Sequence, residues 1–165
     1  MELKEYILKN ECLEIHVCNL GGIIKNLFVR DCRWQRVDVV LGFDTVEQYI
    51  DPAYRNNYPY FGALIGRYGN RIKNGEITID NKTYPLNKNE KENCLHGGTP
   101  GFDQQIWDVE QPDDEHLILR YTSPNGENGF PGTLDVTVRY SIENNVFRVI
   151  YDASCDQPTH VNLTQ

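Results

Sequence analysis

The sequence lacks any run of lysine or arginine residues, and its formal net charge is −8 at pH 7. A negatively charged chain repels phosphate backbones, so we expect no nucleic acid partner. Long apolar runs are absent as well: the opening residues MELKEYILKN mix charges into the apolar positions, unlike a signal peptide, and no later stretch has the length of a membrane span. These absences predict a cytoplasmic protein that has no membrane partner.

Paired cysteine motifs are also lacking. The chain has five cysteines and no CxxC pair, and an odd number cannot close completely into intramolecular bridges. We interpret them as buried, reduced thiols rather than metal or redox sites: Cys12, Cys18, Cys32, Cys94 and Cys155. The sequence contains no GxSxG, GxxxxGK[ST], HExxH or EF-hand pattern, and the GRYGNR run has the wrong glycine spacing for a dinucleotide fingerprint. Nucleotide and metal-hydrolase functions lose support, and we expect no metal site.

The sequence has instead an alternation of apolar and polar residues, which is the pattern of half-buried β-strands. GTLDVTVRYSI, residues 132–142, places its apolar residues on one face, and after the turn residues ENN a second strand begins at VFRVIYDA, residues 146–153. GEITIDNKTYPL, residues 75–86, predicts another hairpin with Asp80 and Asn81 in its turn. Further strands are expected at residues 13–17, 23–29, 37–43 and 116–122, and a final one in THVNLTQ at 159–165.

Helical patterns are almost absent. Only TVEQYI, residues 45–50, is predicted to be helical, with Thr45 as its cap. A chain of 165 residues, of which 39% are hydrophobic, is long enough for one domain with a core, and no linker or repeat divides it. The predicted fold class is therefore all-β and antiparallel, as a sandwich or a large curled sheet.

Two loops concentrate polar and aromatic residues. Residues 56–75, NNYPYFGALIGRYGNRIKNG, interleave tyrosines and glycines with Arg67 and Arg71, and residues 92–109, ENCLHGGTPGFDQQIWDV, carry His96. Arginine, asparagine and neutral imidazole supply the hydrogen bonds that sugar hydroxyls need, and aromatic rings cover the apolar face of a sugar ring. One interpretation of these loops is thus a polyol site.

The same loops also allow a purely structural interpretation. In that case the two arginines pair with nearby carboxylates such as Asp103, and Trp107 lies in the core. Tyr58, Tyr60, Phe102 and Trp107 fit either a stacking surface for a sugar or ordinary core packing. Residue types alone leave both interpretations open.

His96 has an unusual context, because two glycines, Gly97 and Gly98, follow it directly. We interpret these glycines as leaving room for a small molecule to approach the backbone. A structural role for a lone histidine stays open as the alternative. No motif surrounds the other histidines, which are His16, His116 and His160.

Four ordered segments together resemble the aldose 1-epimerase (galactose mutarotase) family. They are PYFGALIGRYGNRIKNGEITIDNKTYPL, NCLHGGTPGFDQQIW, SPNGENGFPGTLDVTVRYSI and THVNLTQ. The resemblance implies the family's antiparallel β-supersandwich fold. It also implies interconversion of the α and β anomers of a free aldose such as glucose or galactose, without a cofactor. By the same resemblance, Asn70, Arg71 and His96 bind the sugar, and Arg67 is structural.

The resemblance covers only the N-terminal half of such an enzyme. Mutarotation needs a general acid for the ring oxygen and a base for the anomeric hydroxyl. In the family these are a histidine directly after the VNLT[NQ] segment and a glutamate far downstream, so the acid is expected just after Gln165, and His160 does not replace it. We therefore expect one wall of a sugar site and no catalytic residue in residues 1–165. Alone, these residues should be inactive and self-associate through uncovered strand edges.

Two other functions stay open at this point. An epimerase of hexose 6-phosphates is a related enzyme, and its substrate would require additional cationic residues near the pocket. A non-catalytic sugar-binding or regulatory protein would keep the binding wall without the chemistry. An aldose is the expected partner in the leading interpretation, and the sequence does not set the oligomeric state.

Overall fold

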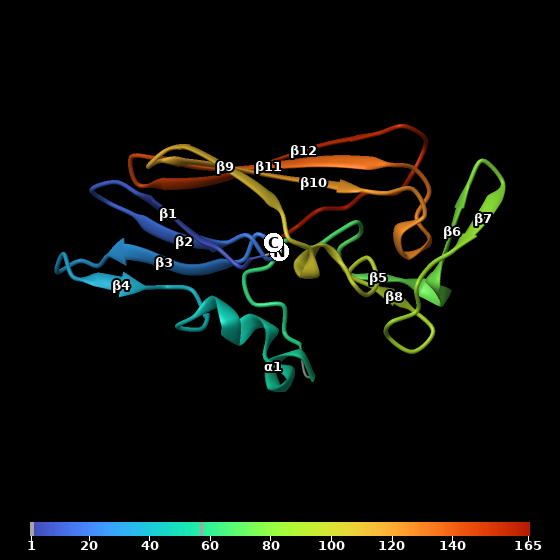
Figure 1. Ribbon diagram of the computed structural model, residues 1–165, viewed down its shortest axis with the longest axis horizontal. Coiled ribbons are helices and arrows are strands. Elements are labelled where there is room, and N and C mark those ends of the chain that lie inside the picture. Colours follow the sequence, from blue (N-terminus) through green and yellow to red (C-terminus); the bar gives the residue numbers. More distant parts are fainter. Residues whose placement is uncertain (1, 57) are drawn as a thin grey trace.

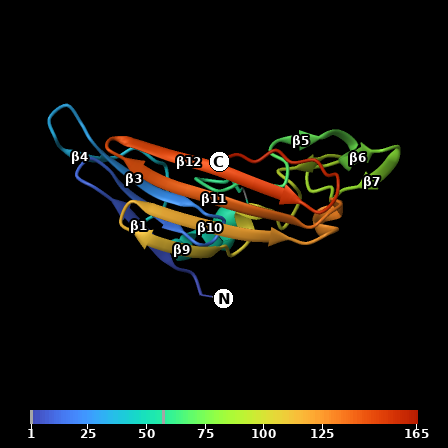
Figure 2. The same cartoon turned by 90° about the horizontal axis from the view of Figure 1, so that it is seen from above.

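The structure, a computed structural model, describes residues 2–56 and 58–165. Two four-stranded antiparallel sheets stack face to face (Figure 1). The first has the order β1-β2-β3-β4, with β1 Glu5–Lys9, β2 Glu14–Cys18, β3 Ile24–Arg30 and β4 Arg36–Asp38. The second has the order β12-β11-β10-β9, with β9 Asp108–Asp113, β10 His116–Ser123, β11 Leu134–Glu143 and β12 Val146–Cys155. Figure 2 shows the strands of the second sheet lying side by side.

Strand β11 shows most directly how the sequence specifies this fold. Its alternate residues are all buried: Leu134, Val136, Val138, Tyr140 and Ile142. It pairs with β10 on one side and β12 on the other, and the β12 pairing runs from Leu134 to Glu143. The antiparallel pair predicted at residues 132–153 is confirmed, and so is the strand predicted at 116–122.

One hydrophobic core fills the space between the two sheets. Its buried residues come from both, and they include Leu8, Ile15, Val17, Leu117, Leu119, Val136 and Val138. Trp107, just before β9, also belongs to this core, and its indole N–H donates to the carbonyl oxygen of Phe102 at 3.1 Å. The molecule is therefore a sandwich rather than a single curled sheet.

Two small strand pairs extend from one end of the sandwich (Figure 1). One joins β5 (Arg71–Ile72) to β8 (Cys94–Leu95), and the other joins β6 (Glu76–Ile79) to β7 (Lys82–Pro85). Asp80 and Asn81 turn the second hairpin with φ values of 49° and 62°, which tight hairpin turns require. The hairpin predicted at residues 75–86 is thus confirmed. The helical segments are η1 Val46–Ile50, α1 Pro52–Asn56, η2 Lys73–Gly75, η3 Phe102–Gln104 and η4 Glu127–Gly129.

Two strand predictions were wrong. Residues 37–43 were expected to form a strand, but β4 ends at Asp38. Val39 and Leu41 are 57% and 70% exposed, so the apolar residues there have no core to face. The final segment THVNLTQ forms no continuous strand and makes only single bridges, from Asn162 to Tyr68 and from Thr164 to Ile65.

The helical prediction was incomplete. Residues 46–50 form η1, and the backbone N–H of Thr45 donates to the side chain of Gln48 at 3.0 Å. The helix α1 was not expected. Its signal is the Asp51-Pro52 pair: the Asp51 carboxylate accepts the Ala53 backbone N–H at 2.7 Å, and proline suits the first helical position.

All five cysteines are free thiols. Cys18 and Cys94 are buried as expected and Cys12 and Cys155 are half-buried, but Cys32 is exposed, so the expectation of burial was wrong there. Within residues 2–56 and 58–165, no group of His, Cys, Asp or Glu side chains is arranged to hold a metal ion. No helix in the same ranges has the length and apolar character to cross a membrane.

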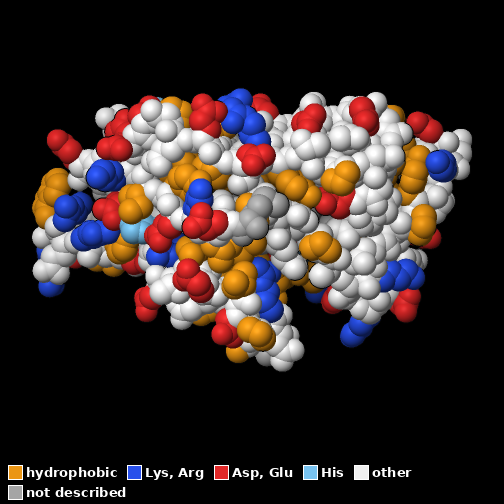
Figure 3. Space-filling view, in the orientation of Figure 1, with side chains coloured by type: hydrophobic (Ala, Val, Ile, Leu, Met, Phe, Trp, Pro, Cys, Tyr) orange, Lys and Arg blue, Asp and Glu red, His pale blue; other side chains and the backbone are white. Residues whose placement is uncertain are grey.

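Large hydrophobic side chains are exposed near the outer strands of both sheets. Trp34, in the turn before β4, is 76% exposed, and Val146 and Ile150 of β12 are 49% and 44% exposed. Figure 3 shows hydrophobic atoms among the charged groups on one face of the molecule. Because β4 and β12 are outer strands, each has one edge without a strand partner in the described part of the chain.

Candidate functional site

The pairing of β5 with β8 brings the three expected sugar-binding residues together. Arg71 pairs with Leu95, so His96, the next residue, lies beside Asn70 at the end of the strand pair. The backbone N–H of Asn70 donates to Nδ1 of His96 at 3.0 Å, and the backbone N–H of His96 donates to the carbonyl oxygen of Asn70 at 3.0 Å. Asn70, Arg71 and His96 therefore adjoin one another, and this cluster is called the sugar wall below, after the ligand that the family resemblance predicts.

The hydrogen bond from Asn70 assigns the tautomer of His96. Because Nδ1 accepts a backbone N–H, the proton of the neutral ring is on Nε2, which is then a hydrogen-bond donor. Burial lowers the pKa of His96, and the nearby Arg71 charge lowers it further. The edge of the ring contacts Tyr60, with ring centroids 4.7 Å apart. His96 thus presents a neutral, oriented N–H group.

Arg71 is exposed and held by Glu90. Its Nη2 lies 3.1 Å from Oε1 of Glu90 and its Nε lies 3.3 Å from Oε2, so the guanidinium is bound by both carboxylate oxygens. These hydrogen bonds raise the pKa of Arg71 and lower that of Glu90, and Asn93 also donates to Glu90 at 3.1 Å. The structural interpretation offered Asp103 as a partner of this arginine, and the structure gives Glu90 instead.

Arg67 has a structural role, as the family resemblance implies. It is 2% exposed, and its guanidinium donates to the Ser123 hydroxyl at 2.8 Å and to the carbonyl oxygens of Ser123, Pro124 and Pro131 at 2.9 to 3.0 Å. These bonds tie the loop before β5 to the loop between β10 and β11. The guanidinium therefore donates its hydrogen bonds to other groups of the protein and is buried away from any ligand.

Gly97 and Gly98 are required by the packing of the chain itself. Their φ values are 84° and 95°. A Cβ atom on Gly97 would collide with the Gly66 carbonyl group, and one on Gly98 would lie 2.7 Å from the side chain of Asn128. The expectation that these glycines leave space for a sugar was therefore wrong: the space belongs to neighbouring protein atoms.

The four aromatic residues singled out in the sequence divide into two pairs. Phe102 and Trp107 are each 2% exposed and contact each other edge to face, so they are core residues. Tyr58 and Tyr60, with ring centroids 4.3 Å apart, line a hollow of about 360 Å³. This tyrosine hollow is lined by Arg55, Asn56, Tyr58, Tyr60, Asn89, Glu90, Leu95, Thr99 and Gln104.

A buried polar cluster lies behind the tyrosine hollow. Asp103 is 1% exposed, and its Oδ2 lies 3.8 Å from Nη1 of Arg55, whose guanidinium is 4.4 Å from the ring centre of Tyr58. Burial raises the pKa of both Asp103 and Tyr58. Within the described residues, the carboxylate of Asp103, the hydroxyl of Tyr58 and Nη1 of Arg55 have no hydrogen-bond partner.

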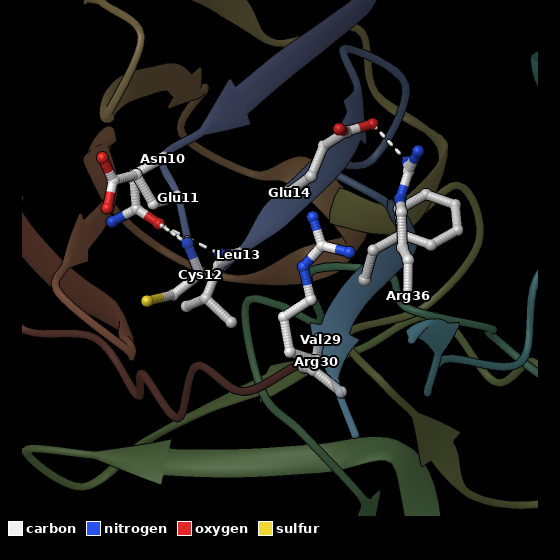
Figure 4. A pocket seen from close by; sticks show the side chains of 9 residues that line it. Asn10, Glu11, Cys12, Leu13, Glu14, Val29, Arg30 and Arg36 are labelled. Atoms are coloured by element: carbon white, nitrogen blue, oxygen red, sulfur yellow. Dashed lines mark hydrogen bonds and ion pairs between the residues drawn. The ribbon is translucent and has the colours of Figure 1, made fainter. Parts of the chain in front are cut away.

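A second hollow, at the opposite end of the sandwich, is too small for a sugar (Figure 4). Its volume is about 50 Å³, which is room for a few water molecules. Glu14 and Arg36 form an ion pair across it, and Arg36 stacks 3.7 Å from the ring centre of Phe28. Two of its charged groups, Glu14 and Arg36, are thus already paired with each other.

Sequence reasoning missed Glu90, Arg55 and the role of Asp103. Glu90 meets Arg71 across 19 residues of sequence, and no periodic pattern marks that contact. His16, which had no motif context, lies between Glu5 and Glu14 on the outer face of the first sheet, at 2.6 and 2.8 Å. His160 is exposed and outside the sugar wall.

The chain is similar to known proteins in its sequence. The model of the aldose 1-epimerase family matches residues 4–165. Over 162 residues the chain is 39% identical to the galactose mutarotase of Bos taurus, covering 98% of this chain and 46% of the relative. It is 38% identical over 128 residues to the aldose 1-epimerase of Escherichia coli K12, covering 77% of this chain and 36% of the relative. The chain spans about half the length of the curated relatives it matches.

Solved structures show the same fold. An aldose epimerase homologue from C. elegans superposes with a TM-score of 0.88 at 27% identity, covering 98% of this chain and 49% of that one. The galactose 1-epimerase of Lactobacillus acidophilus NCFM gives a TM-score of 0.83 at 26% identity, covering 99% and 47%. The architecture is the antiparallel β-supersandwich of the galactose mutarotase type, represented by about half of it.

Proposed function

The chain belongs to the aldose 1-epimerase family, and from that premise we propose that it carries one wall of the sugar site of an isomerase. The proposed enzyme interconverts the α and β anomers of free hexoses such as glucose and galactose, and it acts in the cytoplasm. Residues 1–165 form a single structural portion of its domain, since both sheets share one core.

One observation carries the proposal: the reciprocal hydrogen bonds of Asn70 and His96, at 3.0 Å each. They orient a neutral imidazole so that Nε2–H is a donor beside the guanidinium of Arg71. A sugar oxygen accepts hydrogen bonds from such donors, and neither donor has to release a proton to bind it. This arrangement supports substrate binding by Asn70, Arg71 and His96.

Ring opening requires two proton transfers. An acid protonates the ring oxygen as the C1–O5 bond breaks, and a base takes the proton of the anomeric hydroxyl; the open aldehyde rotates and closes again. In the proposed mechanism the sugar wall binds and orients the pyranose, while both proton carriers come from chain after Gln165. The reaction breaks and re-forms the C1–O5 bond by proton transfer, with no net oxidation or reduction, so the proposal includes no cofactor.

The position of Gln165 supports an acid placed directly after it. Its Nε2 donates to the carbonyl oxygen of Gly62 at 2.8 Å, and its Oε1 accepts the hydroxyl of Tyr140 at 2.8 Å. Gly62 is two residues from Tyr60, which contacts His96. The side chain of Gln165 is thus tied to the loop that borders the sugar wall.

The charges near the sugar wall favour a neutral substrate over a hexose phosphate. Arg71 is bound by Glu90, and Arg55 faces Asp103 at 3.8 Å. The lowered pKa of His96 keeps its ring uncharged at neutral pH. A phosphate group is bound most strongly by cations that no carboxylate already occupies.

The test is polarimetry with the full-length protein that contains residues 1–165. The optical rotation of freshly dissolved α-D-glucose and α-D-galactose should change faster than it does spontaneously. The optical rotation of glucose 6-phosphate should change only at its spontaneous rate. Faster exchange with the phosphate sugar alone would assign the protein to hexose 6-phosphates. Galactose binding at the spontaneous rate of exchange would show a non-catalytic sugar-binding protein instead.

A further inference from the structure

Strand β8 has a second edge, opposite β5, that lies beside His96. In the two-stranded sheet of the described chain, β5 is the strand partner of β8. The backbone N–H of His96 faces β5, where it donates to the carbonyl oxygen of Asn70. Because successive backbone groups of a strand point to alternate sides, the N–H and C=O groups of Leu95 point away from β5. Leu95 is half-buried, so these two groups need another hydrogen-bond partner.

The side chain of Asn89 supplies that partner. Its Oδ1 accepts the Leu95 backbone N–H at 2.7 Å, and its Nδ2 donates to the Leu95 carbonyl oxygen at 2.9 Å. The amide thus pairs with Leu95 as the backbone of a third strand would, and the reversed amide would satisfy neither group. Asn89 comes from the segment between β7 and β8. It therefore fixes the backbone of the residue directly before His96.

A third hydrogen bond closes the turn that carries His96. Nδ2 of Asn89 also donates to the Thr99 hydroxyl at 3.1 Å, so one side chain holds both ends of residues 95–99. His96, inside this turn, has a φ value of 54°. Residues other than glycine rarely adopt such a value, so contacts from outside the turn have to maintain it.

Asn89 acts on the sugar wall through the backbone rather than through a ligand. Both N–H groups of its amide are used by Leu95 and Thr99, so the side chain has no donor left for a sugar hydroxyl. A shift of the Leu95 backbone would move the imidazole of His96 and its hydrogen bond with Asn70. A displacement of about 1 Å in a binding group can lower the rate about 100-fold.

We propose that Asn89 is a positioning residue of the sugar wall, which holds the His96 imidazole in place through the backbone of Leu95. The inference rests on the proposed function, because the wall must bind the substrate for this position to affect turnover. One consequence is independent of any substrate: without Asn89, the ring of His96 should be displaced in the free protein as well.

Two neutral substitutions test this role in the full-length protein. Asn89→Ala removes all three hydrogen bonds, and Asn89→Leu removes them while it keeps the branched shape of the side chain. Asn10→Ala is the matched control. The Asn10 amide accepts two backbone N–H groups of its own turn and donates to the Asn144 carbonyl oxygen. It lies between β1 and β2, at the other end of the sandwich (Figure 1).

The first readout is the rate of anomer exchange. We expect Asn89→Ala to lower kcat/KM for galactose about tenfold or more. Asn89→Leu should act in the same direction, which keeps the test informative if Asn89→Ala fails to fold. Asn10→Ala should stay within about twofold of wild type, although it also loses three hydrogen bonds.

The second readout is an NMR titration of the His96 ring, with its signals assigned by their loss in His96→Ala. Burial lowers the pKa of His96 in the wild-type protein, and the Arg71 charge lowers it further. A displaced ring is more hydrated, so its titration midpoint should rise toward 6.5 in both Asn89 variants. Asn10→Ala should leave the midpoint unchanged.

The outcomes separate this inference from the proposed function. If the wild-type protein accelerates no sugar, the proposed function is wrong. A raised His96 midpoint in the Asn89 variants then still supports the positioning of the ring, and an unchanged midpoint overturns it. If the wild type is active, kinetics of the folded Asn89 variants within about twofold of wild type overturn the inference. An equal loss in Asn10→Ala would show a general effect of lost hydrogen bonds and overturn it too.

Discussion

Asn70 and His96 hold each other through two hydrogen bonds of 3.0 Å, one from each backbone N–H group. The backbone therefore sets both the orientation and the tautomer of the imidazole before any ligand arrives. Both residues have positive φ values, 71° for Asn70 and 54° for His96. Residues other than glycine rarely adopt such values, so the backbone holds this pair in an uncommon conformation. Binding to a preorganised donor of this kind loses less conformational entropy than binding to a mobile side chain.

The first prediction concerns pH. Burial, with a smaller effect of Arg71, lowers the pKa of His96 below its usual 6.5. Protonation at Nδ1 removes the acceptor for the Asn70 N–H, so sugar affinity should fall as the pH drops through the pKa of the folded protein. The unfolded chain binds its proton already near pH 6.5, so the contribution of His96 to stability is present above pH 6.5 and is lost as the pH falls through the folded pKa.

An NMR titration of the His96 ring protons checks this prediction. The midpoint should lie below 6.5 in the wild-type protein and should rise in Arg71→Gln, which removes the second cause. A midpoint at or above 6.5 in the wild type would contradict the assignment of a neutral ring.

A second prediction concerns Glu90, which we expect to position Arg71. Glu90→Gln weakens the two-point hold on the guanidinium, so KM for galactose should rise about threefold to tenfold, with a smaller change in kcat. Arg71 is exposed and Glu90 is half-buried, so thermal stability should change little. Glu92→Gln, which breaks the exposed Lys88–Glu92 pair, is the control and should leave KM unchanged. Equal KM values for both variants would argue against a positioning role.

A third prediction separates backbone strain from collision. Gly97 and Gly126 have similar φ values, 84° and 87°, but a Cβ on Gly97 would collide with Gly66, whereas a Cβ on Gly126 would meet nothing within 4 Å. Gly126→Ala should cost about 1 kcal/mol of unfolding free energy from strain alone. Gly97→Ala should cost clearly more, about 3 kcal/mol, because the loop must also shift. Urea denaturation measures both, and equal losses would show that the collision is relieved without cost.

A fourth prediction concerns residues 1–165 produced alone. The outer strands β4 and β12 have free edges in the described chain, and Trp34, Val146 and Ile150 are exposed. We expect this segment to self-associate or precipitate and to show no mutarotase activity. Light scattering after size-exclusion chromatography is the measurement. A monodisperse monomer that unfolds cooperatively would contradict the prediction.

Much of the sandwich is predictable from the sequence because its central strands alternate strongly. Leu134 to Ile142 bury every second residue, and the Asp80-Asn81 turn marks its hairpin. Strands β1 and β9 were missed because charged and polar residues obscure their alternation: their sequences are EYILK and DVEQPD. The strand predicted at residues 37–43 was wrong, because apolar residues form a buried strand only where another part of the protein packs against them. Here Val39 and Leu41 are exposed.

The site was predictable only in part. The resemblance located Asn70, Arg71 and His96, and the structure places them together. The sequence did not reveal Glu90, because a contact between loops leaves no periodic trace. It also misled on Gly97, since the close approach of the Gly66 backbone is a tertiary contact that residue types do not encode.

The most direct test of the central claim is kcat/KM for galactose in His96→Ala, measured in the full-length protein against wild type. His160→Ala, an exposed histidine outside the sugar wall, is the control. The sugar wall predicts a loss of about 100-fold in His96→Ala and no change in His160→Ala. Kinetics of a folded His96→Ala protein within about twofold of wild type would contradict the role of His96 and, with it, the sugar wall.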